Sequence, residues 1–413
     1  MANSILTPTM ITREALRVLH SKLNFIGNVN RQYDDRFAQT GAKIGTSLNV
    51  RMPAKFTTRT GATLTVQDYI ERSTPLTVSS QIGVDVSFTT VDLTMSLDDF
   101  SQRIITPAMA VLAATIESNC LTAAYKLVAD YVGTTNANIT FLETQQMRQY
   151  ITEKLAPPDN RAMILCPNDS VYWMDATKGL FVPTSNLTDQ YREGMLGRNA
   201  GFDVYENTLL PSFTTGTLAG SAVTTGTNGT TTTSNSWVSQ TTISVTGATS
   251  ATTLVAGDII TLSNVYEIHP ESKTTLTRLK RFVVQSAVTL TTAATAYAVT
   301  IQPGLIWGSG NAYQNCYVSG ASSSGLTVTL ALSSTTAYNQ SLAFHQDAFV
   351  FATADLIDVS QYGAWGARET MDGISMRIAQ QYAIASDNVA TRIDILYGFA
   401  GLYPELAARA LHH

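Results

Sequence analysis

Charge is scarce in this sequence of 413 residues. Asp, Glu, Lys and Arg together make up only 14% of it, against roughly a quarter in an average soluble domain. The scarcity is concentrated, because residues 207–257 and 282–346 contain no charged side chain at all. Long uncharged tracts rich in Thr, Ser, Gly, Val and Ala favour β-structure of extracellular or virion-type proteins, and they suit a metabolic enzyme poorly.

Cysteine is scarce as well. Cys120, Cys166 and Cys316 are odd in number, widely spaced and without a CxxC pair, which excludes a disulfide framework. We expect three buried small residues in a protein made in a reducing cytoplasm. The first twenty residues contain no apolar core of a signal peptide, and the longest apolar stretch, "AMAVLAAT", is too short to span a bilayer. We therefore expect neither secretion nor membrane contact.

Catalytic and metal-binding motifs are also missing. The sequence has no GxxxxGK[ST], no GxGxxG after a strand, no GxSxG and no HExxH among its five histidines. His412 and His413 are interpreted as an exposed tail rather than as a ligand pair. Asp98 and Asp99 lie where a helix begins, so capping is the favoured role. We expect no enzyme, and no catalytic, cofactor-binding or metal-binding residues.

The charge that is present is unevenly distributed. Residues 1–60 contain nine Lys or Arg and three Asp or Glu, a local charge of +6, whereas the whole chain has a net charge of −5. A basic amino-terminal arm could meet nucleic acid or an acidic partner. The favoured interpretation is simpler: these charges solvate a helix and a loop.

The amino-terminal region predicts a helix and two strands. "ITREALRVLHSKL" has helical apolar spacing, with Thr12 as its cap. Residues 48–52 and 84–88 alternate like half-buried strands. The long segment between them has no helical period, so we expect a loop or two-stranded arm. Such an arm is marginally stable alone and needs a neighbouring subunit to pack on.

The strongest helix signal follows. Ser96 and Asp99 form a capping box, and Pro107, capped by Thr106, begins a second helical segment that keeps its period until Gly133. A helix of about 25 residues is roughly 38 Å long. It predicts the spine of an α+β body, to which further elements belong: helices near 140–156, 167–179 and 188–197, and strands near 161–166 and 201–211.

A block of β-structure interrupts this body. Short period-two segments, separated by Gly, Asn or Pro, occur between residues 222 and 343 and predict a small β-barrel or sandwich. Strands like those of the body return after residue 343. The block is therefore interpreted as an insertion. "SAVTTGTNGTTTTSNSW" at 221–237 is expected to be the outbound crossing, poorly ordered at 225–236 with Trp237 packed, and "SSTTAYNQSLAF" at 333–344 the return.

Two segments carry a resemblance to a known family. They are "NRQYDDRFAQTGAKIGTSLNVRMP" and "AGDIITLSNVYEIHPESKTTLTRLKRFVVQSAVTL", the second with Gly257, Asp258, Asn264 and Val265 followed by "RFVV" at 281–284. Together with the order of elements, they resemble the major capsid (coat) proteins of tailed double-stranded-DNA bacteriophages. More narrowly, they resemble the podovirus-type coat family, which has the Hong Kong 97 (Johnson) fold and an inserted domain.

The resemblance implies an α+β capsid fold with a barrel inserted into its A-domain. It implies the following ranges: 1–44 N-arm; 45–90 E-loop; 91–205 spine helix and first part of the P-domain; 206–221 first part of the A-domain; 222–343 inserted β-barrel; 344–369 second part of the A-domain; 370–413 return strands of the P-domain and the carboxyl terminus.

The resemblance also implies partners. Copies of the chain would form hexamers and pentamers of an icosahedral shell in the virion, assembled in the bacterial cytoplasm with a scaffolding protein. A portal protein would occupy one vertex, a decoration protein is possible, and packaged double-stranded DNA would be met non-specifically. Lys55 is the only lysine in the implied E-loop; with no partner Asn or acid identified, we do not expect crosslinking. The alternative is a β-rich virion adhesin or tail-associated binding protein.

Overall fold

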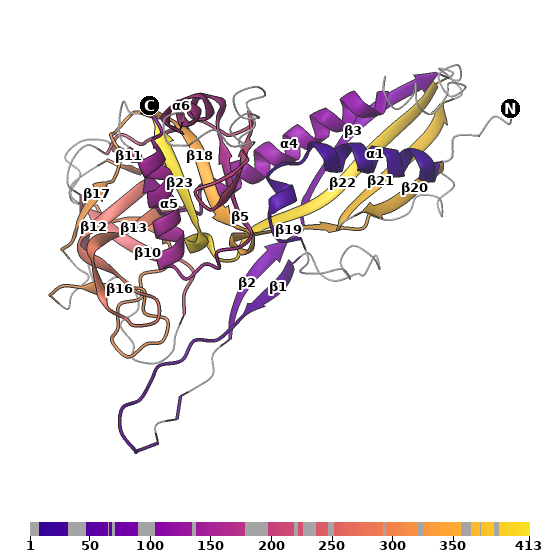
Figure 1. Ribbon diagram of the computed structural model, residues 1–413. Coiled ribbons are helices and arrows are strands. Elements are labelled where there is room, and N and C mark those ends of the chain that lie inside the picture. Colours follow the sequence, from indigo (N-terminus) through magenta and orange to yellow (C-terminus); the bar gives the residue numbers. More distant parts are fainter. Residues whose placement is uncertain are drawn as a thin grey trace. The chain divides into compact units, whose positions relative to one another are not determined.

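The computed structural model describes most of the chain in two compact units (Figure 1). The described residues are 8–31, 47–64, 66–67, 71–89, 104–133, 138–177, 197–218, 222–225, 237–246, 252–291, 295–320, 325–356, 365–371, 373–383 and 388–413. Unit 1 comprises Met1–Val50, Thr74–Leu121 and Phe349–Leu402, and unit 2 comprises Arg51–Ser73, Thr122–Ala348 and Tyr403–His413. Each unit therefore draws on segments that are far apart in the sequence.

Unit 1 is built on an antiparallel sheet of order β19-β22-β21-β20, with β3 also paired to the long strand β22. The strands are β3 (Ser80–Thr89), β19 (Phe349–Ala354), β20 (Trp365–Met371), β21 (Ile374–Ala383) and β22 (Asn388–Gly401). In β3, half-buried Ile82, Val84 and Val86 alternate with exposed residues. The alternation predicted for this strand is confirmed.

Among the described residues, α1 and most of α4 belong to this unit, and both helices differ from the prediction at one end. α1 (Pro8–Lys22) packs on β20 and β21 through a buried apolar stripe that includes Ala15, Leu16 and Leu19. The predicted cap was wrong: Pro8 already lies in the helix, because proline is tolerated in a first turn, so Thr12 is a buried interior residue.

The spine helix α4 (Thr106–Tyr125) begins where Thr106 and Pro107 predict, but it is 20 residues long and does not continue to Gly133. The helix ends in a turn whose hydrogen bonds are donated by the N–H groups of Leu127 and Val128. The chain then forms β4 (Tyr131–Val132), which pairs with β23 (Ala407–His412). The apolar residues at positions 131 and 132 continue the helical spacing, but they belong to strand β4. The capping box expected at Ser96 and Asp99 lies outside the described residues.

The predicted two-stranded arm is present. β1 (Ser47–Met52) and β2 (Arg72–Thr77) form a sheet of their own, and Figure 1 shows the loop between them as a long extended excursion. Within this loop the Thr57 N–H donates to Gln67 Oε1 at 2.8 Å, and Gln67 Nε2 donates to the Thr57 carbonyl at 2.5 Å. These two bonds join the outgoing and returning sides of the arm.

Unit 2 contains a mixed sheet, called the host sheet here, of order β4-β23-β18-β5-β7-β6 with β8 paired to β18. Its remaining strands are β5 (Arg161–Leu165), β6 (Arg198–Asn199), β7 (Phe202–Glu206), β8 (Phe213–Thr214) and β18 (Ala337–His345). Helices α5 (Phe141–Glu153) and α6 (Pro167–Thr177) contribute to its core, in which Met147, Met163, Trp173 and Phe202 are fully buried. The short 3-10 turns η4 (Gln346–Ala348) and η6 (Pro404–Leu406) also lie in unit 2, whereas η1 (Ile26–Asn28) lies in unit 1.

The inserted block is a closed antiparallel barrel. Its ring runs β13-β15-β10-β9-β17-β12 and closes because β12 also pairs with β13; β16 lies beside β12 outside the ring. The strands are β9 (Ala222–Thr225), β10 (Thr241–Thr246), β12 (Ile259–Ile268), β13 (Thr275–Val284), β15 (Tyr297–Gln302), β16 (Cys316–Val318) and β17 (Thr327–Leu330), with β11 (Thr252–Leu254) and β14 (Val288–Leu290) paired separately. Closure leaves the ring without edge strands.

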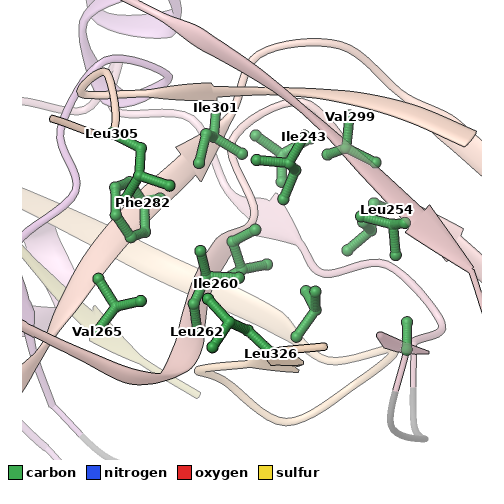
Figure 2. Close-up of a cluster of buried hydrophobic side chains, with 14 of the residues drawn as sticks. Ile243, Leu254, Ile260, Leu262, Val265, Phe282, Val299, Ile301, Leu305 and Leu326 are labelled. Carbon is green, nitrogen blue, oxygen red and sulfur yellow. The ribbon is translucent and has the colours of Figure 1, made fainter. Parts of the chain in front are cut away.

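The barrel has its own apolar core. Figure 2 shows Ile243, Ile260, Phe282 and Ile301 pointing toward one another from four different strands, and all are fully buried. Burying one such side chain contributes about 1.5–3 kcal/mol. The barrel predicted from period-two spacing is thus confirmed.

The crossings into the barrel differ from the prediction. Ala222–Thr225 is already a barrel strand, because β-branched threonine suits a pleated surface, so the outbound crossing lies earlier, at residues 213–218. Residues 226–236, expected to be poorly ordered, lie outside the described residues. The compact units do not follow the boundaries of the implied capsid ranges. The host sheet, for example, joins strands between residues 131 and 206 to β23. The capsid-domain names given to those ranges stay a prediction.

Candidate functional site: the junction between barrel and host sheet

The two crossings run side by side. Thr214 pairs with Ala337, and Phe213 pairs with Tyr338, in the short ladder of β8 and β18. Past this ladder, the Thr215 N–H donates to the Thr336 carbonyl at 3.0 Å and the Thr215 hydroxyl donates to the Ser333 carbonyl at 2.6 Å. Because both strands of the neck are hydrogen-bonded to each other, the barrel is joined to the host sheet by a ladder rather than by two loose linkers.

A buried aspartate fixes the barrel end of this neck. Asp258 is completely buried, and its carboxylate accepts from the backbone N–H of Gly216 at 3.1 Å and of Val255 at 2.6 Å. Burial raises the pKa of Asp258, an effect that these two backbone donors oppose. The preceding Gly257 has φ +105°, and a Cβ there would lie 2.8 Å from the Tyr125 ring. Glycine and aspartate at 257 and 258 are therefore both required by the junction.

Arg409 of β23 ties the host sheet to the same turn. Its guanidinium is fully buried, with Nη2 donating to the Gly257 carbonyl at 3.1 Å and with the rings of Tyr125 and Phe213 each 5.8 Å away. Burial lowers the pKa of Arg409 to about 10, while Tyr125 and Asp258 oppose that shift. Arg409, on the last strand, thus contacts the end of the spine helix, the outbound crossing and the barrel turn.

A second set of contacts, called the charge seam here, joins α5 to the barrel. Its members are Asp130, Glu153, Lys154, Glu267, Arg278, Lys280 and Arg281. Glu267 of β12 is the centre: its carboxylate contacts Lys154 Nζ and Arg278 Nε directly and lies 3.6 Å from Lys280 Nζ. Arg278 Nη1 also contacts Glu153 at 2.5 Å. One barrel acid therefore neutralises cations from both sides of the junction.

Burial shapes the electrostatics of this seam. Burial would raise the pKa of Asp130, but Lys154 and three further cations hold it below its usual value. Burial lowers the pKa of Lys154, a shift that Lys280 increases and Asp130 opposes. Asp130 is thus kept ionised by cations that in turn need a buried carboxylate.

Tyr131, next to Asp130, adds neutral contacts. Arg281 Nη1 donates to the Tyr131 carbonyl at 2.7 Å, and its guanidinium lies 4.3 Å from the centre of the Tyr131 ring. The Tyr131 hydroxyl donates to the Ala331 carbonyl at 2.9 Å. Burial raises the pKa of this tyrosine, so it stays a hydrogen-bond donor at neutral pH.

His412 corrects the interpretation of the chain end as an exposed tail. It is the last residue of β23 and is buried, with Nδ1 3.4 Å from Asp169 Oδ1 and Nε2 3.3 Å from Glu143 Oε2; only His413 is exposed. Burial would lower the pKa of His412, but the two carboxylates together raise it to about 9. The Ser341 hydroxyl donates to Asp169 at 2.5 Å rather than to the histidine, so this is a buried structural network.

The other residues singled out in the sequence lie apart. The three cysteines are buried and unpaired as predicted, and burial raises the pKa of the Cys166 thiol to about 11. Lys55 is half-buried, and Asp98 and Asp99 lie outside the described residues. In the part of the chain that the structure describes, no group of histidine, cysteine and acidic side chains could hold a metal ion. No described helix is long and apolar enough to cross a membrane.

Sequence reasoning missed the charge seam and Arg409. A signal existed for Glu267, because it is a lone acid between apolar neighbours in "NVYEIHP", and the next strand carries "RLKR". Arg409 in "LAARAL" is a lone cation in an otherwise apolar strand. A single charge within a buried strand predicts a partner, but it does not say which one.

Comparison with protein-family models gives a match over nearly the whole chain. The family model described as P22 coat protein, gene protein 5, matches residues 3–411. A solved structure of Mycobacterium phage Che8 is 9% identical with a TM-score of 0.48, covering 94% of this chain and 90% of that chain. The capsid structure of Cyanophage P-SCSP1u is 12% identical with a TM-score of 0.43, covering 89% of this chain and 84% of that chain. Among curated protein sequences none matches this chain.

Proposed function

Since this chain belongs to the P22 coat protein family and is thus a major capsid protein with the Hong Kong 97 fold, we propose that the arm between β1 and β2 packs on a neighbouring copy. As a capsid protein, the chain forms a homo-oligomeric icosahedral shell in the virion. The alternative of a β-rich virion adhesin or tail-associated binding protein is thereby set aside.

The exposed apolar side chains of the arm support this proposal most directly. Phe56, Leu64 and Val66 are 63%, 77% and 81% exposed. A two-stranded arm has no core of its own, so these large apolar side chains stay in water unless another surface covers them. Many weak copies of one contact are sufficient in a closed shell, because symmetry repeats each of them.

We further propose the partners expected for a shell that is filled with DNA. A scaffolding protein would direct assembly in the host cytoplasm, a portal protein would occupy one vertex, and a decoration protein is possible. Packaged DNA would be met by non-specific contact only, because the net charge of −5 does not favour tight binding of phosphates. We propose no catalytic role, and no cofactor or metal.

The test is assembly of the purified chain with its scaffolding protein, followed by electron microscopy. Wild-type protein is expected to form closed shells, and Leu64→Asp on the arm is expected to prevent them while leaving the subunit folded. Tyr317→Asp places the same charge on an exposed barrel residue that is outside the arm, 46% exposed, and serves as the control. Normal shells from Leu64→Asp would refute the packing of the arm on a neighbour.

A further inference from the structure

Arg72 is the first residue of β2, at the base of the arm, and it is surrounded by aromatic rings. Its guanidinium carbon lies 5.8 Å from the ring centre of Trp237, 5.4 Å from that of Tyr313 and 5.7 Å from that of Tyr403. These three residues are called the Arg72 cage. Trp237 and Tyr313 belong to the barrel, whereas Tyr403 precedes β23. A residue of the arm is thus held by segments far from it in the sequence.

The cage is suited to a cation that has few other partners. Arg72 is buried, with 7% of its surface exposed, its Nη2 is 3.5 Å from the Pro53 carbonyl, and its Nε has no hydrogen-bond partner. Cation–π attraction strengthens when the cation is shielded from water.

Tyr313 holds the other side of the arm as well. Its hydroxyl accepts a hydrogen bond from the Lys55 backbone N–H at 3.2 Å. Lys55 lies on the outgoing side of the arm and Arg72 on the returning side, so a single barrel residue contacts both sides. The arm is therefore clamped at its base, where a small contact fixes the direction of the whole excursion.

The barrel loop that carries Tyr313 is itself braced. The Tyr313 N–H donates to Asn311 Oδ1 at 2.8 Å. Lys273 Nζ donates to the carbonyls of Ala312 and Gln314, each at 2.9 Å. The loop that carries Tyr313 is thus held by one side-chain acceptor and by a lysine that donates to two of its carbonyls.

We propose that the inserted barrel sets the direction of the arm through the Arg72 cage before subunits meet. In this role the barrel is a positioning device: it holds the arm in the conformation that a neighbour binds, so less conformational entropy is lost on assembly. The consequence for assembly rests on the proposed packing of the arm. The positioning itself is a property of the single subunit and can be measured without assembly.

The experiment measures the direction of the arm in the unassembled full-length chain. Spin labels are attached to Thr60→Cys on the arm and Ser286→Cys on the barrel, both exposed positions, and the distance distribution is recorded by pulsed electron resonance. The native cysteines are buried and are not expected to react. Wild type is expected to give one main peak. In Tyr313→Leu the share of molecules outside this peak is expected to rise about tenfold.

Two further variants separate the contacts. Tyr313→Phe keeps the ring but loses the hydroxyl that Lys55 uses, so it is expected to stay near wild type if the cage dominates. Tyr317→Leu removes an exposed barrel tyrosine outside the cage and is expected to leave the distribution unchanged. Arg72→Met keeps an unbranched side chain without the charge and is expected to match Tyr313→Leu.

The outcomes are distinguishable. Unchanged distributions in both Tyr313→Leu and Arg72→Met would overturn the proposal. Loss of the folded barrel in both variants would overturn it too, because Arg72 would then stabilise the barrel rather than position the arm. A loosened arm with normal shell assembly would confirm the cage and contradict the packing of the arm on a neighbour.

Discussion

Replacing Glu267 with glutamine removes one charge from the centre of the charge seam. The amide has the same shape as the carboxylate, so packing between β12, β13 and α5 is preserved. What changes is the electrostatic balance, because Lys154, Arg278 and Lys280 all contact or face this carboxylate. The variant therefore tests whether the barrel is held on the host sheet by charge as well as by the neck.

The magnitude follows from the composition of the seam. Four basic side chains face three carboxylates, and burial lowers the pKa of one of them, Lys154, to about 7. Glu267→Gln therefore removes one of three negative charges while Arg278, Lys280 and Arg281 remain. The side chains of Lys154 and Glu267 are only 8% and 3% exposed, so water cannot replace the lost carboxylate. Removing one partner of a buried ion pair costs about 3–5 kcal/mol. A whole domain is stable by only about 5–15 kcal/mol, so the effect is expected to be large.

The assay is urea unfolding of the unassembled subunit, followed by tryptophan fluorescence. Glu271→Gln, an exposed acid on the barrel, is the matched control and is expected to change the unfolding free energy by less than about 0.5 kcal/mol. In the double variant Lys154→Met with Glu267→Gln, part of the loss should be recovered, because an unpaired buried ammonium is removed. Equal unfolding free energies of Glu267→Gln and Glu271→Gln would refute the reasoning. So would a double variant whose loss equals the sum of the losses of Lys154→Met and Glu267→Gln measured singly.

Three further outcomes are expected. Gly257→Ala should destabilise the chain by about 1–3 kcal/mol more than Gly310→Ala, since both glycines have positive φ but only at 257 does a Cβ meet the Tyr125 ring; equal losses in thermal unfolding would contradict this. His412 has a pKa raised from its ordinary value of 6.5 to about 9, so its contribution is complete below pH 6.5 and is lost as pH rises toward 9; unfolding of His412→Gln should lack that decline, whereas unfolding of His413→Gln should retain it. No thiol should react with a thiol reagent before the subunit unfolds, and all three should react afterwards, because every cysteine is buried; rapid labelling of the native subunit would oppose this.

The local spacing of apolar and polar residues was sufficient to predict some elements of the fold. Period-two spacing predicted the barrel strands, and the lack of any period predicted the arm. The same reasoning failed where a tertiary contact decided the outcome. Apolar spacing extends the spine helix toward Gly133, but pairing of β4 with β23 makes residues 131–132 a strand. A threonine-rich stretch has the composition of a linker, yet Ala222–Thr225 is a ladder strand between β10 and β17.

The two kinds of information separate by range. Spacing, turn residues and uncharged tracts act over a few residues, and they suffice for the class of fold and for the strands of the barrel. The partners of Glu267, Arg72 and Arg409 are brought together from segments that are tens to hundreds of positions apart, so no local pattern identifies them. Burial then gives these charges their importance, because a cation shielded from water must find a carboxylate, a carbonyl or an aromatic ring. Which of these it finds depends on how the strands close into the barrel and the host sheet.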